Sequence, residues 1–173
     1  ALDKTGTITQ GQPALSDVIA IDTDSTESFK KIALSLTQMS DHPVSIAISK
    51  GLIKQGESDT QDVDNFTALL GRGIQGRIKQ QRYYLANTRL AKELALLTPE
   101  LIERISKLER QAKTLNLLMT DKTVLAIFAV ADKVKPNSAL AIEQLHRLKV
   151  KTMMLSGDNQ HAANVIGEQV GID

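Results

Sequence analysis

Apolar residues recur every three or four positions in two early stretches of the chain, and this spacing predicts amphipathic helices. The first stretch covers residues 26–39 and the second covers residues 43–53. The sequence Ser-Asp-His-Pro between them fits a helix break followed by a newly capped helix start. A third helix is expected over residues 98–113, because Thr, Pro and Glu open it as cap, first residue and first-turn acid.

The middle of the chain alternates apolar and polar residues, and this pattern predicts strands. Residues 65–87 fit strands with a turn near Gln80–Gln81, and a helix is expected over residues 88–96. Two apolar runs, residues 115–120 and 123–130, flank a tight antiparallel turn. Together these elements predict an antiparallel α+β unit.

The end of the chain has a different character. A helix follows Pro136, a strand is expected over residues 150–155, and a helix over residues 162–170 follows a polar turn. The first residues, Ala1–Leu2, look like the end of a strand that leads into an acidic turn. These outer segments predict parts of a parallel α/β sheet, interrupted by the antiparallel unit.

Composition narrows the possible functions. The chain has 173 residues, of which 42% are hydrophobic and only 3% aromatic, so the expected core is aliphatic. A formal net charge of +1 gives no electrostatic support for binding nucleic acid. The absence of cysteine excludes disulfides and thiolate metal sites, and three separated histidines, His42, His146 and His161, give little support for an imidazole metal site. The apolar runs are too short to span a bilayer.

The string Asp3-Lys4-Thr5-Gly6-Thr7 holds the main candidate chemistry. An acid at the carboxyl end of a parallel strand stands where open α/β sheets bind their ligands. Such a carboxylate can attack phosphorus and form an acyl phosphate. The Lys4 cation and the hydroxyls of Thr5 and Thr7 suit an anionic site that contains magnesium. The alternative is a capped turn without chemistry, which a bare Asp-Lys-Thr would favour.

The full string resembles the P-type ATPases, cation pumps that phosphorylate the Asp of this motif and share the haloacid dehalogenase-like fold with many phosphatases. The resemblance implies that Asp3 is the phosphorylated residue. Those phosphatases usually carry a second Asp two residues after the nucleophile, whereas this chain has Thr5. Because a Thr cannot deprotonate the hydrolytic water, the acyl phosphate is expected to persist, as a pump requires.

The turn Ser156-Gly157-Asp158-Asn159 lies between a predicted strand and a predicted helix. Backbone N–H groups at such a place bind phosphate oxygens. The turn resembles the TGDN element of the pumps, which implies that Ser156, Gly157 and Asp158 hold the phosphoryl group together with Thr7. Residues 132–136 look like the hinge between the nucleotide and phosphorylation domains of the pumps.

The Ser-Asp-His-Pro break resembles the SEHP element of the heavy-metal-transporting branch of these pumps. The resemblance implies that His42 contacts the adenine of ATP and that Asp41 stands in place of the usual Glu. Thr37 occupies the position, five residues before the His, where that branch often has a Glu that helps to hold adenine.

The stretch Gly71-Arg72-Gly73-Ile74-Gln75-Gly76 has the spacing of a dinucleotide-binding loop. No helix is expected after it, as that loop would require, so we reject this interpretation. Gly71 and Gly73 instead match a Gly-x-Gly of the heavy-metal branch, where glycines let the backbone approach the nucleotide.

The resemblance implies an antiparallel nucleotide-binding domain at residues 23–131, inserted in a Rossmann-like phosphorylation domain at residues 1–22 and 132–173. Its cofactors would be ATP and Mg²⁺, with Asp3 and Thr5 at the metal and Lys4 as a further catalytic residue. The expected context is a cytoplasmic domain of an integral membrane protein, whose membrane helices bind the transported heavy metal. The chain alone is expected to be monomeric and unable to turn over as a pump. A phosphatase of the same fold and a non-catalytic nucleotide-binding regulatory domain remain as alternatives.

Overall fold

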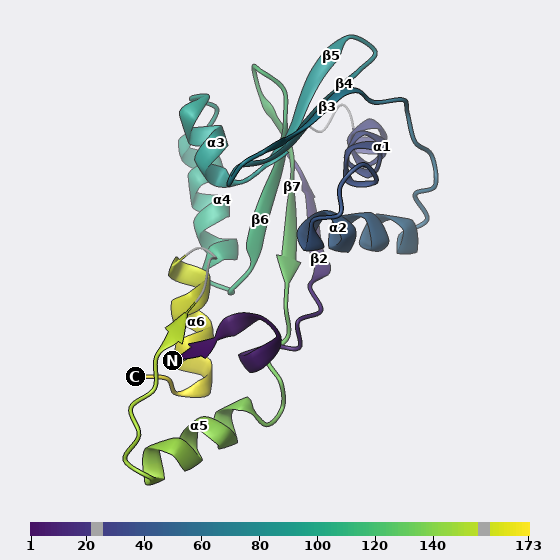
Figure 1. The fold of residues 1–173 in the computed structure, drawn as a ribbon. Coiled ribbons are helices and arrows are strands. Elements are labelled where there is room, and N and C mark those ends of the chain that lie inside the picture. Colours follow the sequence, from purple (N-terminus) through teal and green to yellow (C-terminus); the bar gives the residue numbers. More distant parts are fainter. Residues whose placement is uncertain (22–25, 156–159) are drawn as a thin grey trace.

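The computed structural model describes residues 1–21, 26–155 and 160–173. Figure 1 shows two parts, an upper one built on a large sheet and a lower one that holds both ends of the chain. The chain passes from the lower part to the upper part once and returns once. This arrangement confirms the expected antiparallel unit inserted in a smaller parallel α/β unit.

The upper part is a six-stranded sheet in the order β2-β7-β6-β5-β4-β3, and every neighbouring pair is antiparallel. Four helices accompany it. The strands are β2 (Ala14–Ala20), β3 (Asp64–Leu69), β4 (Gly73–Ile78), β5 (Gln81–Ala86), β6 (Thr114–Met119) and β7 (Val124–Ala131). The helices are α1 (Thr26–Thr37), α2 (Pro43–Lys54), α3 (Thr88–Glu93) and α4 (Pro99–Glu109).

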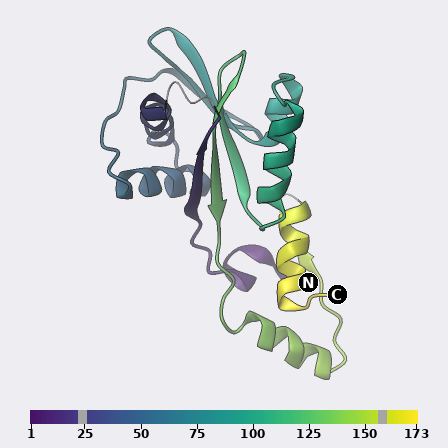
Figure 2. The same cartoon turned by 180° about the vertical axis from the view of Figure 1, so that it is seen from behind.

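Helices cover both faces of this sheet. Figures 1 and 2 show α1 and α2 on one face and α3 and α4 on the other. β7 serves both faces, because Phe128 and Val130 belong to the core under α1 and α2 while Ile127 and Ala129 belong to the core under α3 and α4. A strand that is buried on both sides has an almost continuous apolar sequence, which explains the run at residues 124–131.

The lower part contains a two-stranded parallel sheet of β1 (Leu2–Asp3) and β8 (Met154–Leu155), with a helical turn, η1 (Lys4–Ile8), directly after β1. Two helices complete it, α5 (Ser138–Arg147) and α6 (Gln160–Val170). A third apolar cluster holds these elements together, and its buried members are Ile8, Ile142, Ile166 and Val170.

Several expectations differ from the structure. The helix expected over residues 98–113 ends at Glu109. The strand expected over residues 150–155 is only Met154–Leu155, because its partner β1 offers two residues for pairing. The helix expected over residues 88–96 ends at Glu93, because Ala95 takes a left-handed conformation with φ of 55°. The turn expected near Gln80–Gln81 lies one residue earlier, at Lys79 and Gln80, which both have positive φ.

The strand β2 belongs to the upper part, which affects the first domain boundary. Residues 1–22 were expected in the phosphorylation domain, but β2 pairs with β7 along its length and forms an edge of the upper sheet. We therefore propose a first boundary near Pro13, just before β2.

Candidate functional site

Asp3 is the last residue of β1, and its side chain is exposed. It pairs in parallel register with Leu155, the last residue of β8. The carboxyl ends of both strands therefore meet at one edge, where open α/β sheets bind ligands. In the sequence, Leu155 directly precedes Ser156. Ser156, Gly157 and Asp158 themselves lie outside the described residues.

The loop after Asp3 turns away from the strand. Among the described residues, the Asp3 side chain makes no capping hydrogen bond to η1, so its carboxylate is not used to hold this turn. Thr5 and Thr7 are exposed, whereas Lys4 is buried. The carbonyl oxygen of Lys4 accepts a hydrogen bond from the N–H of Thr9 at 3.0 Å, and this bond closes the loop.

Two residues that we did not assign to the site organise this loop. Thr9 is fully buried, and its hydroxyl lies 2.6 Å from Oδ2 of Asp132. The Asp132 carboxylate also accepts hydrogen bonds from the N–H groups of Gly11 and Gln12, both at 3.1 Å. The signals for them in the sequence are a polar residue beside the phosphorylation motif and an acid at the end of an apolar strand.

Gly71 and Gly73, which we predicted to approach the nucleotide, lie in the turn between β3 and β4 and at the start of β4. An added Cβ at Gly71 would meet no described heavy atom within 4 Å. At Gly73, with φ of 141°, the same atom would lie 2.4 Å from the carbonyl oxygen of Leu85. Gly73 is thus required because β5 approaches it closely, whereas the expected reason was a close approach to the nucleotide. At Gly71 the turn is open to solvent.

Asn87, which lies between β5 and α3, holds this turn by a hydrogen bond. Its Nδ2 donates to the carbonyl oxygen of Gly71 at 2.9 Å, and its Oδ1 accepts from the N–H of Leu90 as the cap of α3. Arg72 forms two hydrogen bonds with Glu93, at 2.9 and 3.0 Å, and these lower the pKa of the Glu93 carboxyl. The Arg72 side chain is therefore committed to α3.

His42 is exposed and is the N-cap residue of α2. Its Nδ1 accepts a hydrogen bond from the N–H of Val44 at 3.3 Å, as a neutral ring with its proton on Nε2 can do. Asp41 is also exposed, directly before the cap. The imidazole therefore stabilises the start of α2 through Nδ1, and this cap does not use the Nε2–H group.

Thr37 does not offer the polar group that the Glu of the heavy-metal branch would present to adenine. Its side chain is buried, and its hydroxyl lies 2.8 Å from the carbonyl oxygen of Ala33 and 3.0 Å from that of Leu34 in the same helix. The hydroxyl is thus used inside α1.

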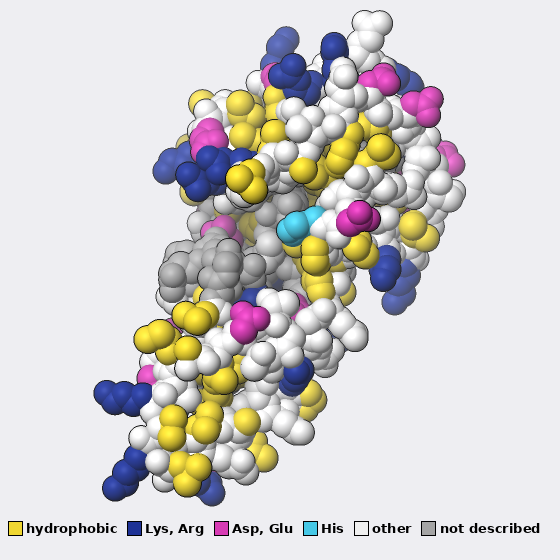
Figure 3. All heavy atoms as spheres, viewed as in Figure 1, with side chains coloured by type: hydrophobic (Ala, Val, Ile, Leu, Met, Phe, Trp, Pro, Cys, Tyr) yellow, Lys and Arg dark blue, Asp and Glu magenta, His cyan; other side chains and the backbone are white. Residues whose placement is uncertain are grey.

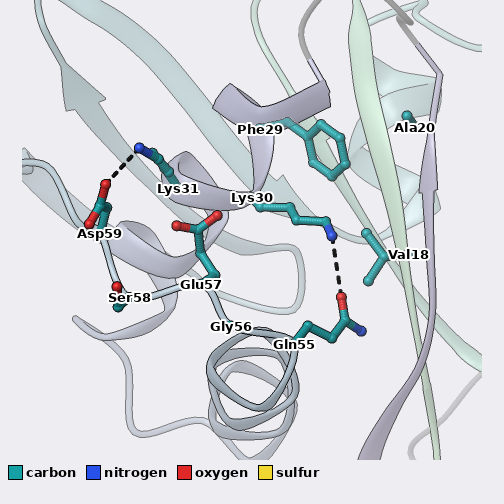
Figure 4. Close-up of a pocket in the computed structure, with 10 residues that line it drawn as sticks. All are labelled: Val18, Ala20, Phe29, Lys30, Lys31, Gln55, Gly56, Glu57, Ser58 and Asp59. Carbon is teal, nitrogen blue, oxygen red and sulfur yellow. Dashed lines mark hydrogen bonds and ion pairs between the residues drawn. The ribbon is translucent and has the colours of Figure 1, made fainter.

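A cleft with a volume of about 560 Å³ lies at the other end of α2, about 18 Å from His42 for a helix of 12 residues. Figure 4 shows Phe29 and Val18 beside it, Lys30 pointing toward Gln55, and Lys31 paired with Asp59. Because Asp59 is already paired with Lys31, this cleft does not offer the net positive lining that a triphosphate needs.

On the described part of the face drawn in Figure 3, Lys and Arg side chains are dispersed rather than gathered in one continuous patch. The described residues include no cluster of three or more His, Cys, Asp or Glu side chains that could hold a metal. Asp3 supplies a single carboxylate, which suits Mg²⁺, since this ion binds through one or two carboxylates together with phosphates and waters.

The structure thus has an aspartate at the carboxyl end of a short parallel strand, beside an inserted antiparallel unit. A family model described as haloacid dehalogenase-like hydrolase matches residues 1–173, and the chain belongs to this family.

More specific relatives match almost the whole chain. It is 40% identical over 179 residues to a probable cadmium-transporting ATPase of Staphylococcus aureus (strain MRSA252), covering 99% of the chain and 24% of that protein. It is also 40% identical over 172 residues to a probable copper-importing P-type ATPase A of Enterococcus hirae, covering 99% of the chain and 23% of that protein.

A solved structure agrees. The crystal structure of a zinc-transporting PIB-type ATPase in its E2·Pi state has a TM-score of 0.71 and 27% identity, over 99% of this chain and 27% of that one. The chain thus matches one segment of proteins named as cadmium-, copper- and zinc-transporting ATPases, and it spans about a quarter of the length of these relatives.

Proposed function

We propose that this chain binds ATP on its upper part and accepts the γ-phosphate on Asp3, as the catalytic region of a pump for a heavy-metal cation. The observation that carries the proposal is the position of Asp3, exposed at the end of β1 and in register with the residue before Ser156. The proposed domains are residues 14–131 for the nucleotide and residues 1–13 and 132–173 for phosphorylation.

The proposed reaction is a displacement at phosphorus. A carboxylate oxygen of Asp3 forms a bond to the γ-phosphorus while the bond from that phosphorus to the oxygen of the leaving ADP breaks. Mg²⁺ held by Asp3 and Thr5 would supply charge neutralisation between the phosphate oxygens. Thr7, Ser156, Gly157 and Asp158 would hold the transferred group, with Lys4 beside it.

The fate of the acyl phosphate separates a pump from a phosphatase. Thr5 stands two residues after the nucleophile and carries no carboxylate to activate water. The intermediate would therefore survive long enough for a change of conformation.

The nucleotide would bind near the start of α2 and the β3–β4 turn. His42 would contact the base, with Asp41 beside it. Gly71 would let the backbone come close to the nucleotide, and Gly73, which is needed for the close approach of β5, would lie beside it. The open position at Gly71 and the support of the turn by Asn87 favour this arrangement.

The proposed location is the cytoplasmic side of a membrane. Within the described residues, no helix is long and apolar enough to cross a bilayer. We therefore assign the transported cation to membrane helices elsewhere in the parent protein. The names of the relatives include cadmium, copper and zinc transport.

The test is acyl-phosphate formation in the full-length parent protein. With γ-labelled ATP and Mg²⁺, we expect label that is stable in acid and removed by hydroxylamine. Asp3→Asn abolishes it, whereas Asp62→Asn, an exposed acid between α2 and β3, leaves it intact. Unchanged labelling of the Asp3→Asn variant would contradict the proposal.

A further inference from the structure

We propose that Asp132 and Thr9 form a latch that positions the phosphorylation loop against the connection between the two parts. The inference rests on the proposed function, because it concerns the same reaction. The latch is defined as the Asp132 carboxylate with its three donors, the Thr9 hydroxyl and the N–H groups of Gly11 and Gln12.

The Thr9 hydroxyl has one proton and two possible acceptors. Oδ2 of Asp132 lies at 2.6 Å and the carbonyl oxygen of Lys4 at 3.1 Å. A hydrogen bond to a carboxylate is shorter and stronger than one to a neutral carbonyl, so the proton points to Asp132. The oxygen of the hydroxyl is then turned to accept the N–H of Gly6 at 3.3 Å.

Thr9 thus contacts the phosphorylation loop at two residues, Lys4 and Gly6. The backbone N–H of Thr9 binds the carbonyl of Lys4, and its hydroxyl binds the amide of Gly6. The nucleophile Asp3 directly precedes this loop. Since Thr9 is fully buried, water cannot easily replace the Asp132 carboxylate as its partner.

The latch also joins the two chain segments that connect the parts of the molecule. Residues 9–12 lead up to β2, and Asp132 directly follows β7. Further hydrogen bonds tie the same segments, from Gln10 N–H to the carbonyl of Lys133 at 2.8 Å and from Lys135 N–H to the carbonyl of Ile8 at 3.0 Å. The Ser138 hydroxyl donates to the same Ile8 carbonyl at 2.7 Å. A movement at this connection would therefore reach the phosphorylation loop.

Asp132 is a positioning residue rather than a catalytic one. Both of its oxygens are occupied, Oδ2 by Thr9 and Gly11 and Oδ1 by Gln12. Within the described part of the chain, its hydrogen bonds link it to Asp3 through Thr9 and the loop. Its removal should therefore slow phosphoryl transfer without weakening the nucleotide site on the upper part.

The experiment compares five forms of the full-length parent protein: Thr9→Val, Thr9→Ser, Asp132→Asn, the Thr9→Val/Asp132→Asn double variant and the unmodified protein. Rapid-quench labelling at saturating ATP gives the rate of acyl-phosphate formation, and a separate titration gives ATP affinity. Thermal unfolding checks the fold. Asp62→Asn and Thr67→Val are matched controls at exposed positions of the upper part.

We expect Thr9→Val and Asp132→Asn each to slow acyl-phosphate formation roughly 10- to 100-fold, the range that misplacement of a reacting group produces. ATP affinity should not change. Thr9→Ser should restore most of the rate, because it keeps the hydroxyl. The double variant should be no slower than the slower single variant, since both remove one unit.

The latch is overturned if the rates at saturating ATP are unchanged, if Thr9→Ser is as slow as Thr9→Val, or if the two single effects multiply. It is equally overturned if ATP affinity and the unfolding temperature fall together with the rate, which would indicate a general structural role. If the unmodified protein takes no label on Asp3, the proposed function fails, and the latch fails with it.

Discussion

His42 combines two roles that one pair of substitutions can separate. Its Nδ1 caps α2 by accepting the N–H of Val44, and its exposed ring is the proposed contact for the base of ATP. Asparagine is a strong N-cap residue but offers no imidazole. Alanine offers neither function.

We predict that His42→Asn weakens ATP binding while the thermal stability stays close to that of the unmodified chain. His42→Ala should weaken ATP binding to the same extent and also destabilise the fold by about 1 kcal/mol, the usual value of a lost cap. Isothermal titration with an ATP analogue and urea unfolding measure the two effects. Unchanged ATP affinity in His42→Asn would leave the residue with a capping role alone.

At the residue scale, the sequence indicated the exposed chemistry but not its supports. Asp3, His42 and the Gly-x-Gly turn stood out because each belongs to a short local string. Thr9 and Asp132 are 123 positions apart and meet only in the folded chain. Asn87, the N-cap residue of α3, likewise supports Gly71 from 16 positions away in the sequence. A hydrogen bond between distant residues leaves no periodic pattern in a sequence.

At the scale of elements, the edge strand β2 is tied to the residue directly before β6 by an ion pair. Nζ of Lys113 lies 2.7 Å from Oδ2 of Asp17, and the two side chains are 17% and 34% exposed. The hydrogen bond from Lys113, and a second one from Ser16, lower the pKa of Asp17 below its ordinary value. A lowered carboxyl pKa stabilises the fold above the ordinary pKa, and this stabilisation is lost as the pH falls through the folded-state pKa.

We predict that Lys113→Met lowers the free energy of unfolding by roughly 0.5–1 kcal/mol near pH 7, a value limited by solvent screening of a partly exposed pair. The difference should begin to shrink as the pH falls below the ordinary carboxyl pKa of about 4, and it is lost as the pH falls through the lowered pKa of Asp17 in the folded protein. Urea unfolding of both proteins at pH 7 and pH 3 measures it. Lys92→Met, at an exposed position of α3, is the matched control. A difference that is undiminished or larger at pH 3 would contradict this role of the pair.

Elements with a strong local signal were predicted well, and those set by their neighbours were not. Thr98 and Pro99 marked the start of α4, and the two apolar runs around Asp121–Lys122 paired as β6 and β7. No glycine marked the end of α3, because the left-handed residue there is Ala95. The length of β8 is set by its partner β1, which its own sequence does not reveal.

At the scale of the whole molecule, the two halves of the proposed site lie on different parts. Asp3 stands at an edge of the lower sheet, whereas His42 and the β3–β4 turn belong to the upper part (Figure 1). Phosphoryl transfer therefore requires the upper part to present ATP to the lower one. Two chain connections join the parts, and the latch lies where they meet. The inserted architecture was predicted from the change of pattern along the chain, while the domain boundaries remain a proposal.

The most direct test is to identify the phosphorylated residue chemically. The full-length protein is treated with ATP and Mg²⁺, quenched in acid and reduced with borohydride, which converts an aspartyl phosphate to homoserine. Peptide mass spectrometry then locates the modified position. The account predicts homoserine at residue 3 in the unmodified protein and none when ATP is omitted. Homoserine at another aspartate, or an unmodified Asp3 in protein that hydrolyses ATP, would contradict it.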